Sequence, residues 1–287
     1  MAESQPEPPF LRFGPEVPAS PVVLSVPHAG RAYSPALLKA SRLPLRTLEA
    51  LEDRFVDRLV WRAQASGAVA FIACAPRAEI DLNRDQREID PSMITPSPPP
   101  GSFLQSARTR GGLGLIPSRI NGAGAIWHHR IAAAELSRRI AEIHAPYHQA
   151  LERALAAARE RYGVAILLDC HSMPPQEGGA GPPVVFGDRH GTSIAPEYVD
   201  AAVAAARASG FQVGRNSPYA GGYITMRHGK PSSHIHALQL EIDRSRYLDR
   251  AMRAPGPGFD AAAEMIAHVA AALAIKALEP PHAIAAE

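Results

Sequence analysis

Two histidines stand close to the points where apolar, strand-like runs of the sequence end. His28 follows the run 22–27, and His171 comes shortly after the run 164–168. The carboxyl ends of parallel strands meet at one edge of an open α/β sheet, where ligands bind. Because neutral imidazole is a common metal ligand, the two positions predict a mononuclear metal site, with zinc as the first candidate. Asp169 could accept the second ring N–H of His171, although each histidine alone would also suit a turn at a strand exit.

The third ligand of such a site would be a carboxylate from a predicted helix. A catalytic zinc needs about three protein ligands and one open position. Glu52, Asp53 and Asp57 are the acidic candidates, and Asp53 and Asp57 would share a helical face because they lie four residues apart. The alternative is a solvated acidic face that pairs with Arg54 and Arg58. The spacing does not choose between these two interpretations.

A polar stretch that follows the second predicted strand contains groups that could hold a carboxylate. The Arg84 guanidinium could form a forked pair with a substrate carboxylate, and Asn83 could add a hydrogen bond. The alternative is a surface cluster of ion pairs with Asp85, Arg87 and Glu88.

Glu241 is an acid inside another apolar, strand-like segment, 237–242. Burying a carboxylate is costly unless the group is paired or used chemically. Beside a metal-bound water, Glu241 would act first as a general base and then as a general acid. The alternative is an ion pair with Arg244 or Arg246.

Other reactive side chains fit structural roles better. His144 and His148 have the i,i+4 spacing of zinc helices, but they lack the intervening Glu and have Pro146 between them. We therefore expect them to pack or to cap. Ser172 lacks the Gly-x-Ser-x-Gly context of a serine hydrolase, and Cys170 is typical of a small buried core residue.

Strand-like and helical segments alternate along the chain, which predicts a mostly parallel sheet between helical layers. The expected strands are 22–26, 69–74, 80–83, 164–169 and 237–242. The expected helices are 45–66, 127–161 with a break at Pro146, 195–209 and 259–278. Stretches rich in proline or glycine predict loops at 91–102, 111–124, 176–183 and 220–223, and the first of these could be a lid.

The composition excludes several classes of protein. A net charge of +2 gives no bulk electrostatic reason to bind nucleic acid or a membrane surface. The two cysteines form neither a metal spacing nor a disulfide framework, which favours a reducing, cytoplasmic location. The apolar segment 261–278 contains Glu264, His268 and Lys276, so it predicts a docked helix rather than a membrane span.

Seven segments together resemble the N-formylglutamate amidohydrolase family. They are 25–30 (Ser-Val-Pro-His-Ala-Gly), 79–87 with Asp-Leu-Asn-Arg at its centre, 114–117, 146–148, 168–174, 216–223 and 238–244. The segments occur in the right order over residues 22–249. We therefore expect an N-terminal extension at 1–20 and a single catalytic domain over 21–280.

The resemblance implies a fold and a set of metal ligands. The family is similar in fold to zinc carboxypeptidases and aspartoacylase-type acylases, which implies a three-layer α/β/α sandwich with a mixed, mostly parallel central sheet. His28 and His171 would be metal ligands, together with Asp53 or its neighbour Glu52. The metal would be zinc or another divalent ion. In the wider group the acidic ligand follows the first histidine within three residues, where this chain has Arg31.

The resemblance also implies a reaction, the hydrolysis of N-formyl-L-glutamate to L-glutamate and formate at the end of histidine degradation. Glu241 matches the catalytic glutamate of these relatives, and Asn83-Arg84 matches the pair that holds a substrate carboxylate. Tyr223 lies in a matching segment and is a further candidate to contact substrate. A second cation is needed for the γ-carboxylate, and the sequence leaves the choice open among Arg108, Arg110, Arg119 and Arg227.

Two other functional classes stay open. The chain could be a zinc acylase or peptidase that acts on another N-acyl amino acid. It could also be a binding protein without catalytic activity on the same fold, although every expected catalytic residue type is present. In each case the partner is a small N-acyl amino acid, not a nucleic acid or a membrane. The sequence gives no signal for an oligomeric state.

Overall fold

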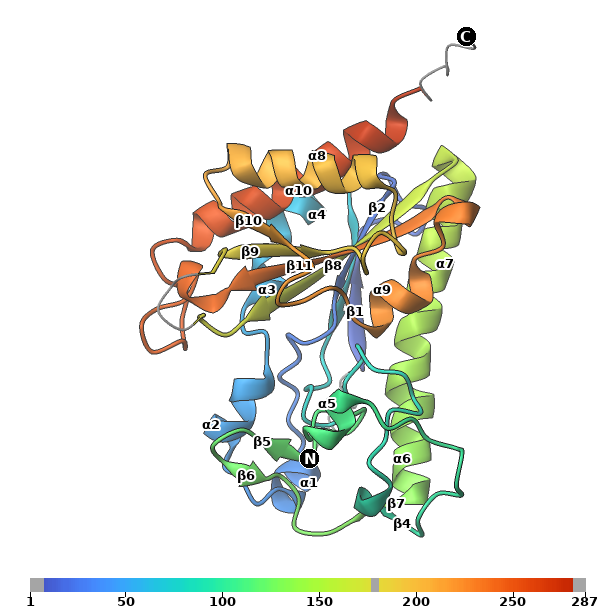
Figure 1. Ribbon diagram of the computed structural model, residues 1–287, viewed down its shortest axis with the longest axis vertical. Coiled ribbons are helices and arrows are strands. Elements are labelled where there is room, and N and C mark those ends of the chain that lie inside the picture. Colours follow the sequence, from blue (N-terminus) through green and yellow to red (C-terminus); the bar gives the residue numbers. More distant parts are fainter. Residues whose placement is uncertain (1–7, 177–180, 281–287) are drawn as a thin grey trace, which may run out of the picture.

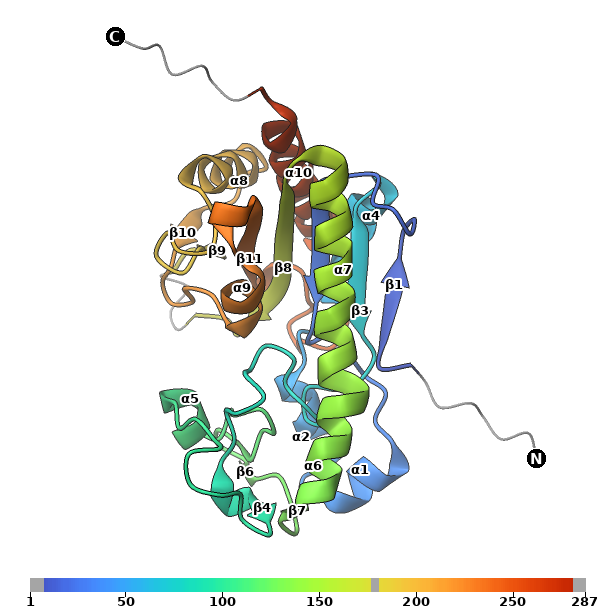
Figure 2. The same cartoon turned by 90° about the vertical axis from the view of Figure 1, so that its right-hand side faces the viewer.

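A central seven-stranded sheet lies between two layers of helices in the computed structural model, which describes residues 8–176 and 181–280 (Figures 1 and 2). The strands, in spatial order, are β1 (Phe10–Phe13), β3 (Val69–Ala73), β2 (Val22–Val26), β8 (Ala165–Met173), β11 (Ile235–Asp243), β9 (Val184–Gly187) and β10 (Val213–Arg215). β1 runs antiparallel to β3 and β9 antiparallel to β11, and the other neighbouring strands are parallel. The expected three-layer sandwich with a mixed, mostly parallel sheet is confirmed.

Helices cover both faces of the sheet. One face packs against α3 (Val56–Leu59), α4 (Trp61–Ala65), α8 (Pro196–Ala208) and α10 (Phe259–Leu278). The other face packs against α7 (Ala145–Tyr162) and α9 (Tyr223–His228). α10 is long and apolar enough to cross a membrane by length and composition. It buries Met265, Ile266, Val269 and Leu273 in the core, as expected for a docked helix.

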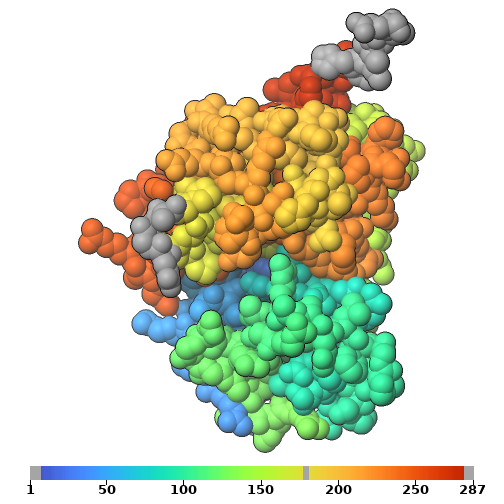
Figure 3. All heavy atoms as spheres, viewed as in Figure 1, coloured from blue at the N-terminus to red at the C-terminus, as the bar shows by residue number. Residues whose placement is uncertain are grey.

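A lower lobe of short elements lies beyond the carboxyl ends of β2, β3 and β8, at the bottom of Figure 1. Its helices are α1 (Pro35–Ala40), α2 (Leu45–Leu48), α5 (Ala107–Arg110) and α6 (Ala133–Arg139), with 3-10 turns at Glu49–Leu51 and Pro91–Met93. Two small ribbons pair β4 (Ile94–Thr95) with β7 (Ile131–Ala132) and β5 (Arg119–Ile120) with β6 (Gly124–Ala125). Figure 3 shows this lobe, in green, against the yellow and orange surface of the sheet lobe.

The expected helix at 45–66 is wrong in a way that matters for the site. The helical pattern is interrupted between Leu51 and Val56, where Phe55 adopts the left-handed conformation with φ 63°. At this interruption the backbone N–H of Asp53 donates to the carbonyl of His28 at 2.9 Å. Asp53 and Asp57 therefore do not share a helical face, and Asp57 pairs with Arg31.

The expected helix break at Pro146 is also wrong. α6 passes through a π-helical segment, Ile140–His144, directly into α7. Proline lacks an N–H and crowds the preceding turn of an α-helix, and the wider π turn just before it lets the helix continue. The helix begins at Ala133 rather than at residue 127.

Of the other helices and strands expected from the sequence, most are confirmed and some are not. The strands at 22–26, 69–74 and 237–242 and the helices at 195–209 and 259–278 are confirmed to within a few residues. β8 continues beyond the expected end to Met173, and 80–83 is a turn rather than a strand. α9 begins at the end of the expected turn 220–223 and was not predicted. Part of the glycine-rich stretch 176–183 lies outside the described residues. The domain boundary at residue 20 stays a prediction, although β1 precedes it and joins the sheet.

Candidate metal centre

Three side chains that are distant in sequence converge at the carboxyl end of the sheet. His28 follows β2, Asp53 lies at the helix interruption, and His171 lies in β8. The Asp53 Oδ2 atom is 3.4 Å from Nδ1 of His28 and 2.9 Å from Nδ1 of His171. One ligand atom from each residue lies within 4.8 Å of the others, and all three side chains are buried. The structure thus brings together the two histidines and the carboxylate expected from the sequence.

The outer nitrogen of each imidazole meets a second carboxylate. Nε2 of His28 is 2.7 Å from Asp81 Oδ1, and Nε2 of His171 is 2.9 Å from Asp169 Oδ2. With a metal bound, these contacts would hold the ring proton on Nε2 and leave the Nδ1 lone pair for the metal. Nδ1 of His28 is buried and has no hydrogen-bond partner among the described residues. Two imidazole nitrogens and one carboxylate oxygen form a donor set that suits zinc or a similar divalent ion.

The acidic member of the cluster is Asp53 rather than its neighbour Glu52. Although burial opposes it, the neighbouring His171 and His28 rings hold the pKa of Asp53 well below its usual range. Glu52 points elsewhere, since it accepts a hydrogen bond from the Tyr33 hydroxyl at 2.7 Å and pairs with Arg54 at 3.0 Å.

Glu241 lies on β11 beside the cluster. It is the register partner of His171 on β8, and its Oε1 accepts a hydrogen bond from the Gln239 amide at 2.8 Å. Burial raises the pKa of Glu241 to about 7, although His171 opposes this shift. The expected alternative, an ion pair with Arg244, does not form: Arg244 donates to Asp53 Oδ1 at 3.1 Å.

Asn83 and Arg84 lie in a turn that contacts the cluster from the lower lobe. The Asn83 side-chain oxygen accepts the backbone N–H of Ile224 at 2.8 Å, and its amide nitrogen is 3.1 Å from Nε2 of His171. Arg84 is buried rather than part of a surface cluster, and it donates to the carbonyls of Leu113 at 2.8 Å and Asn83 at 2.6 Å. Burial lowers the pKa of Arg84 to about 10.

Two buried histidines hold this turn by hydrogen bonds to its backbone carbonyls, and a third contacts one of them. Nε2 of His148 donates to the carbonyl of Leu82 at 3.0 Å, and Nε2 of His144 donates to the carbonyl of Arg84 at 2.9 Å. Nδ1 of His148 must then accept from Nε2 of His228, 3.0 Å away. The expected structural role of His144 and His148 is confirmed, and their positions on the long helix explain how it supports the site.

Similarity to known proteins identifies the family of this chain. A family model described as N-formylglutamate amidohydrolase matches residues 20–248. The chain belongs to the N-formylglutamate amidohydrolase family. N-formylglutamate deformylases from Pseudomonas aeruginosa and Pseudomonas putida are 31% and 30% identical to this family member over 236 residues, covering 80% of this chain and 82% of each relative.

The fold of this family member is similar to that of solved structures. The crystal structure of N-formylglutamate amidohydrolase from Ralstonia eutropha JMP134 matches it with a TM-score of 0.81 and 32% identity, over 94% of this chain and 96% of that chain. The gene product Atu2144 from Agrobacterium tumefaciens matches with a TM-score of 0.62 and 17% identity, covering 93% of this chain and 95% of that chain, and shows the fold alone. The family resemblance drawn from the sequence is confirmed.

Sequence reasoning missed three residues of this N-formylglutamate amidohydrolase family member that lie near His28 or Glu241. Asp81 contacts His28, and Arg77 donates to Asp81 Oδ2 at 2.9 Å. Despite burial, the nearby carboxylates, led by Asp81, raise the pKa of Arg77. Burial and then the Glu241 carboxylate raise the pKa of the Tyr219 hydroxyl. The available signal for Arg77 is its position just after β3, the same strand-end pattern that identified His28.

Arg227 and Tyr223, two of the expected substrate contacts in this family member, lie together on α9. Arg227 forms an ion pair with Glu152 of α7 at 2.9 Å and donates to the Tyr223 hydroxyl at 2.9 Å. Among the described residues, Arg227 makes no hydrogen bond or ion pair with the His-Asp-His cluster. Tyr223 lines a pocket between α9 and α5.

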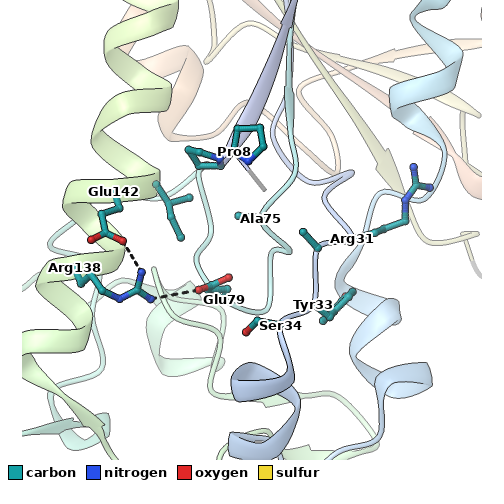
Figure 4. A pocket seen from close by; sticks show the side chains of 11 residues that line it. Pro8, Arg31, Tyr33, Ser34, Ala75, Glu79, Arg138 and Glu142 are labelled. Carbon is teal, nitrogen blue, oxygen red and sulfur yellow. Dashed lines mark hydrogen bonds and ion pairs between the residues drawn. The ribbon is translucent and has the colours of Figure 1, made fainter. Parts of the chain in front are cut away.

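Another pocket of about 640 Å³ lies away from the cluster (Figure 4). It is lined by residues that include Arg31, Tyr33 and Glu79, and none of the three cluster residues contributes to it. Arg138 in its wall bridges Glu142 at 2.6 Å and Glu79 at 3.7 Å. Arg138 and these acids neutralise one another, Arg31 pairs with Asp57 outside the wall, and we assign the pocket no role in this family member.

Proposed function

We propose that this protein is a metal-dependent hydrolase that cleaves the formyl amide of N-formyl-L-glutamate to L-glutamate and formate. Family membership supports the reaction, and the N-formylglutamate deformylases it resembles carry the same activity in their names. The single observation that carries the proposal is the convergence of His28, Asp53 and His171 beside Glu241. The reaction would serve histidine degradation.

We propose zinc as the metal and these three residues as its ligands. The orphaned Nδ1 of His28 and the ionised Asp53 support this choice. When bound, the metal would polarise the formyl oxygen and acidify a water molecule. Asp81 and Asp169 would keep both imidazoles in the tautomer that ligation requires.

Glu241 would move the proton. As general base it takes a proton from the attacking water, and as general acid it delivers that proton to the leaving nitrogen when the C–N bond breaks. The hydrogen bond from Gln239 orients the carboxylate, and burial keeps its pKa close to neutrality, so that both roles are accessible.

Arg84 and Asn83 would bind the substrate α-carboxylate. Nη2 of Arg84 makes only a 3.7 Å contact with Asp81, so it retains donors for an anion. We propose that Tyr223 contacts the substrate from the pocket wall, and that Arg227 acts through the Tyr223 hydroxyl to which it donates.

A cytoplasmic location is part of the same proposal. Cys170 is buried in β8, and its burial raises the thiol pKa, so it behaves as a core residue. Both cysteines lie in or beside apolar strands without disulfide spacing, which suits a reducing compartment.

Formate release before and after chelation tests the proposed function. We expect the purified protein to release formate from N-formyl-L-glutamate, to lose that activity on chelation and to regain it with zinc. N-acetyl-L-aspartate serves as the matched substrate for the competing acylase activity. Faster hydrolysis of N-acetyl-L-aspartate, or full activity in metal-free protein, would contradict the proposal.

A further inference from the structure

A cationic pocket of about 600 Å³ lies where the lower lobe meets the sheet lobe, the boundary visible in Figure 3. The lower lobe contributes all of residues 104–108 and most of 85–88. The sheet lobe contributes Arg189 and most of 221–226. Three arginines line the pocket, namely Arg87, Arg108 and Arg189.

This pocket adjoins the metal centre through one side chain. Gly222 lines the pocket and lies so close to Asn83 that a Cβ atom at Gly222 would come within 2.3 Å of the Asn83 side chain. Asn83 is in turn 3.1 Å from Nε2 of His171. Tyr219 lies three residues before Gly222 on the same loop, and burial and then the Glu241 carboxylate raise the pKa of its hydroxyl. The pocket and the cluster therefore lie on either side of the Asn83 side chain.

Two of the three arginines have no partner of their own. Arg87 is held by Asp85, with both contacts at 3.1 Å. Arg108 and Arg189 make no side-chain hydrogen bond or ion pair with any residue in the ranges 8–176 and 181–280. An unpaired guanidinium in a pocket is suited to bind a carboxylate in forked geometry.

The surroundings add to the attraction for an anion. Burial lowers the pKa of Arg84, and the positive charges of Arg77 and Arg108 lower it further, so three guanidinium groups lie within electrostatic range. The acids of the pocket are already engaged, since Asp85 holds Arg87 and Glu88 accepts the backbone N–H of Asp85 at 3.2 Å.

We propose that Arg108 and Arg189, one from each lobe, bind the distal carboxylate of the substrate across this pocket and so select N-formylglutamate over neutral N-formyl amino acids. This inference rests on the proposed function and deepens it. The other expected cations are engaged elsewhere: Arg227 with Glu152, Arg119 with the carbonyl of Arg110, and Arg110 with the carbonyl of Gln105.

The loop that carries Gly221 positions Arg189. The backbone N–H of Arg189 donates to the carbonyl of Ala220 at 2.7 Å. Gly221 has a φ of 119°, and a Cβ there would come within 2.8 Å of the Arg189 side chain, so glycine leaves that side chain its place in the pocket.

Steady-state kinetics on two matched substrates test the proposal. We would compare wild type, Arg108→Met, Arg189→Met and the double variant on N-formyl-L-glutamate and on N-formyl-L-glutamine, which has a similar shape but no distal charge. Each single variant should raise KM for N-formylglutamate by about 10- to 100-fold, with kcat and the rates on N-formylglutamine nearly unchanged. Arg207→Met, which replaces an exposed arginine on α8, is the control and should behave as wild type.

Equal losses on both substrates, or an unchanged KM for N-formylglutamate, would overturn the proposal. Calorimetric titration with glutarate separates this failure from a failure of the proposed function, because binding of a dicarboxylate requires no turnover. Both arginine variants should bind glutarate about 10-fold more weakly than wild type. Wild type that releases no formate would reject the proposed function, whereas glutarate binding that is equal in wild type and variants would reject the arginine subsite.

Discussion

Glu241 and His171 are register partners on the adjacent parallel strands β11 and β8. The pairing places the proposed general base next to a proposed metal ligand without any loop between them. Because the ladder of backbone hydrogen bonds fixes this register, the two side chains keep their spacing as long as the sheet is folded. The site is thus held at one edge by rigid elements, while Asp53, Asp81 and Asn83 approach it from the chain segments beyond the strand ends.

The first prediction concerns Asp81, the carboxylate that contacts His28. Asp81→Asn should weaken zinc affinity by about 10- to 100-fold, because the amide no longer fixes the ring proton on Nε2 as firmly. Competition with a chromophoric chelator measures the affinity. Asp200→Asn, an exposed residue of a surface ion pair on α8, is the control. Equal affinities for wild type and Asp81→Asn would contradict the assigned role.

A second prediction links the metal to stability. Zinc that binds only the folded protein should stabilise it by about 2.7 kcal/mol at a hundredfold excess over Kd. Thermal unfolding of the metal-free protein, with and without added zinc, measures this effect as a rise in Tm. His28→Ala removes one proposed ligand and should abolish most of the rise. A rise of the same size in His28→Ala would place the zinc elsewhere.

A third prediction concerns pH and the three buried histidines behind the turn. Burial lowers the pKa of His148 well below its usual value and that of His228 to about 3. The unfolded chain therefore takes up protons near the ordinary histidine pKa of about 6.5, while the folded chain does not. The stability should be complete above that pH and should fall, as pH decreases below it, by about 1.4 kcal/mol per pH unit for each histidine.

Urea unfolding at pH 7.5 and pH 5.5 checks this prediction. His228→Asn should lose part of the pH dependence, because one of the buried imidazoles is gone. His190→Asn replaces an exposed histidine and should keep the full dependence. An equal pH dependence in wild type and His228→Asn would show that the His228 imidazole is not held neutral.

The fourth prediction concerns the contact between Gly222 and Asn83. Gly222→Ala keeps an accessible backbone conformation but places a Cβ within 2.3 Å of the Asn83 side chain. We expect a loss of stability of about 1–3 kcal/mol, as for overpacking, and a lower kcat/KM, because Asn83 must move. Denaturation and formate release measure the two effects. Gly111→Ala, where a Cβ would come no closer than 3.3 Å to its neighbours, should be much milder.

The two histidines could be predicted from sequence because local patterns are enough to identify the strands that precede them. The runs before His28 and His171 are apolar enough to identify as strands, and parallel pairing then places their ends at one edge. Glu241 could be singled out for a similar reason, since an acid inside an apolar strand requires an explanation.

The remaining features depend on tertiary contacts that no local pattern reports. Asp53 occupies its position because the helical pattern breaks at Phe55, yet the sequence there has ordinary helical periodicity. The sequence predicts a strand at 80–83, where Ile80 and Leu82 are apolar, but the structure buries these two residues in a turn. Its conformation is set by the imidazoles of the distant long helix, which the spacing of His144 and His148 could not reveal.

The most direct test of the central claim is formate release by the zinc-loaded Glu241→Gln variant, with the zinc content of variant and wild type measured in the same samples. Glu264→Gln, an exposed glutamate on α10, provides the matched control. We predict that Glu241→Gln retains about one zinc per chain, since Glu241 is not in the ligand cluster, and loses at least about a thousandfold in kcat. Near-wild-type turnover by Glu241→Gln with its zinc in place would contradict the account.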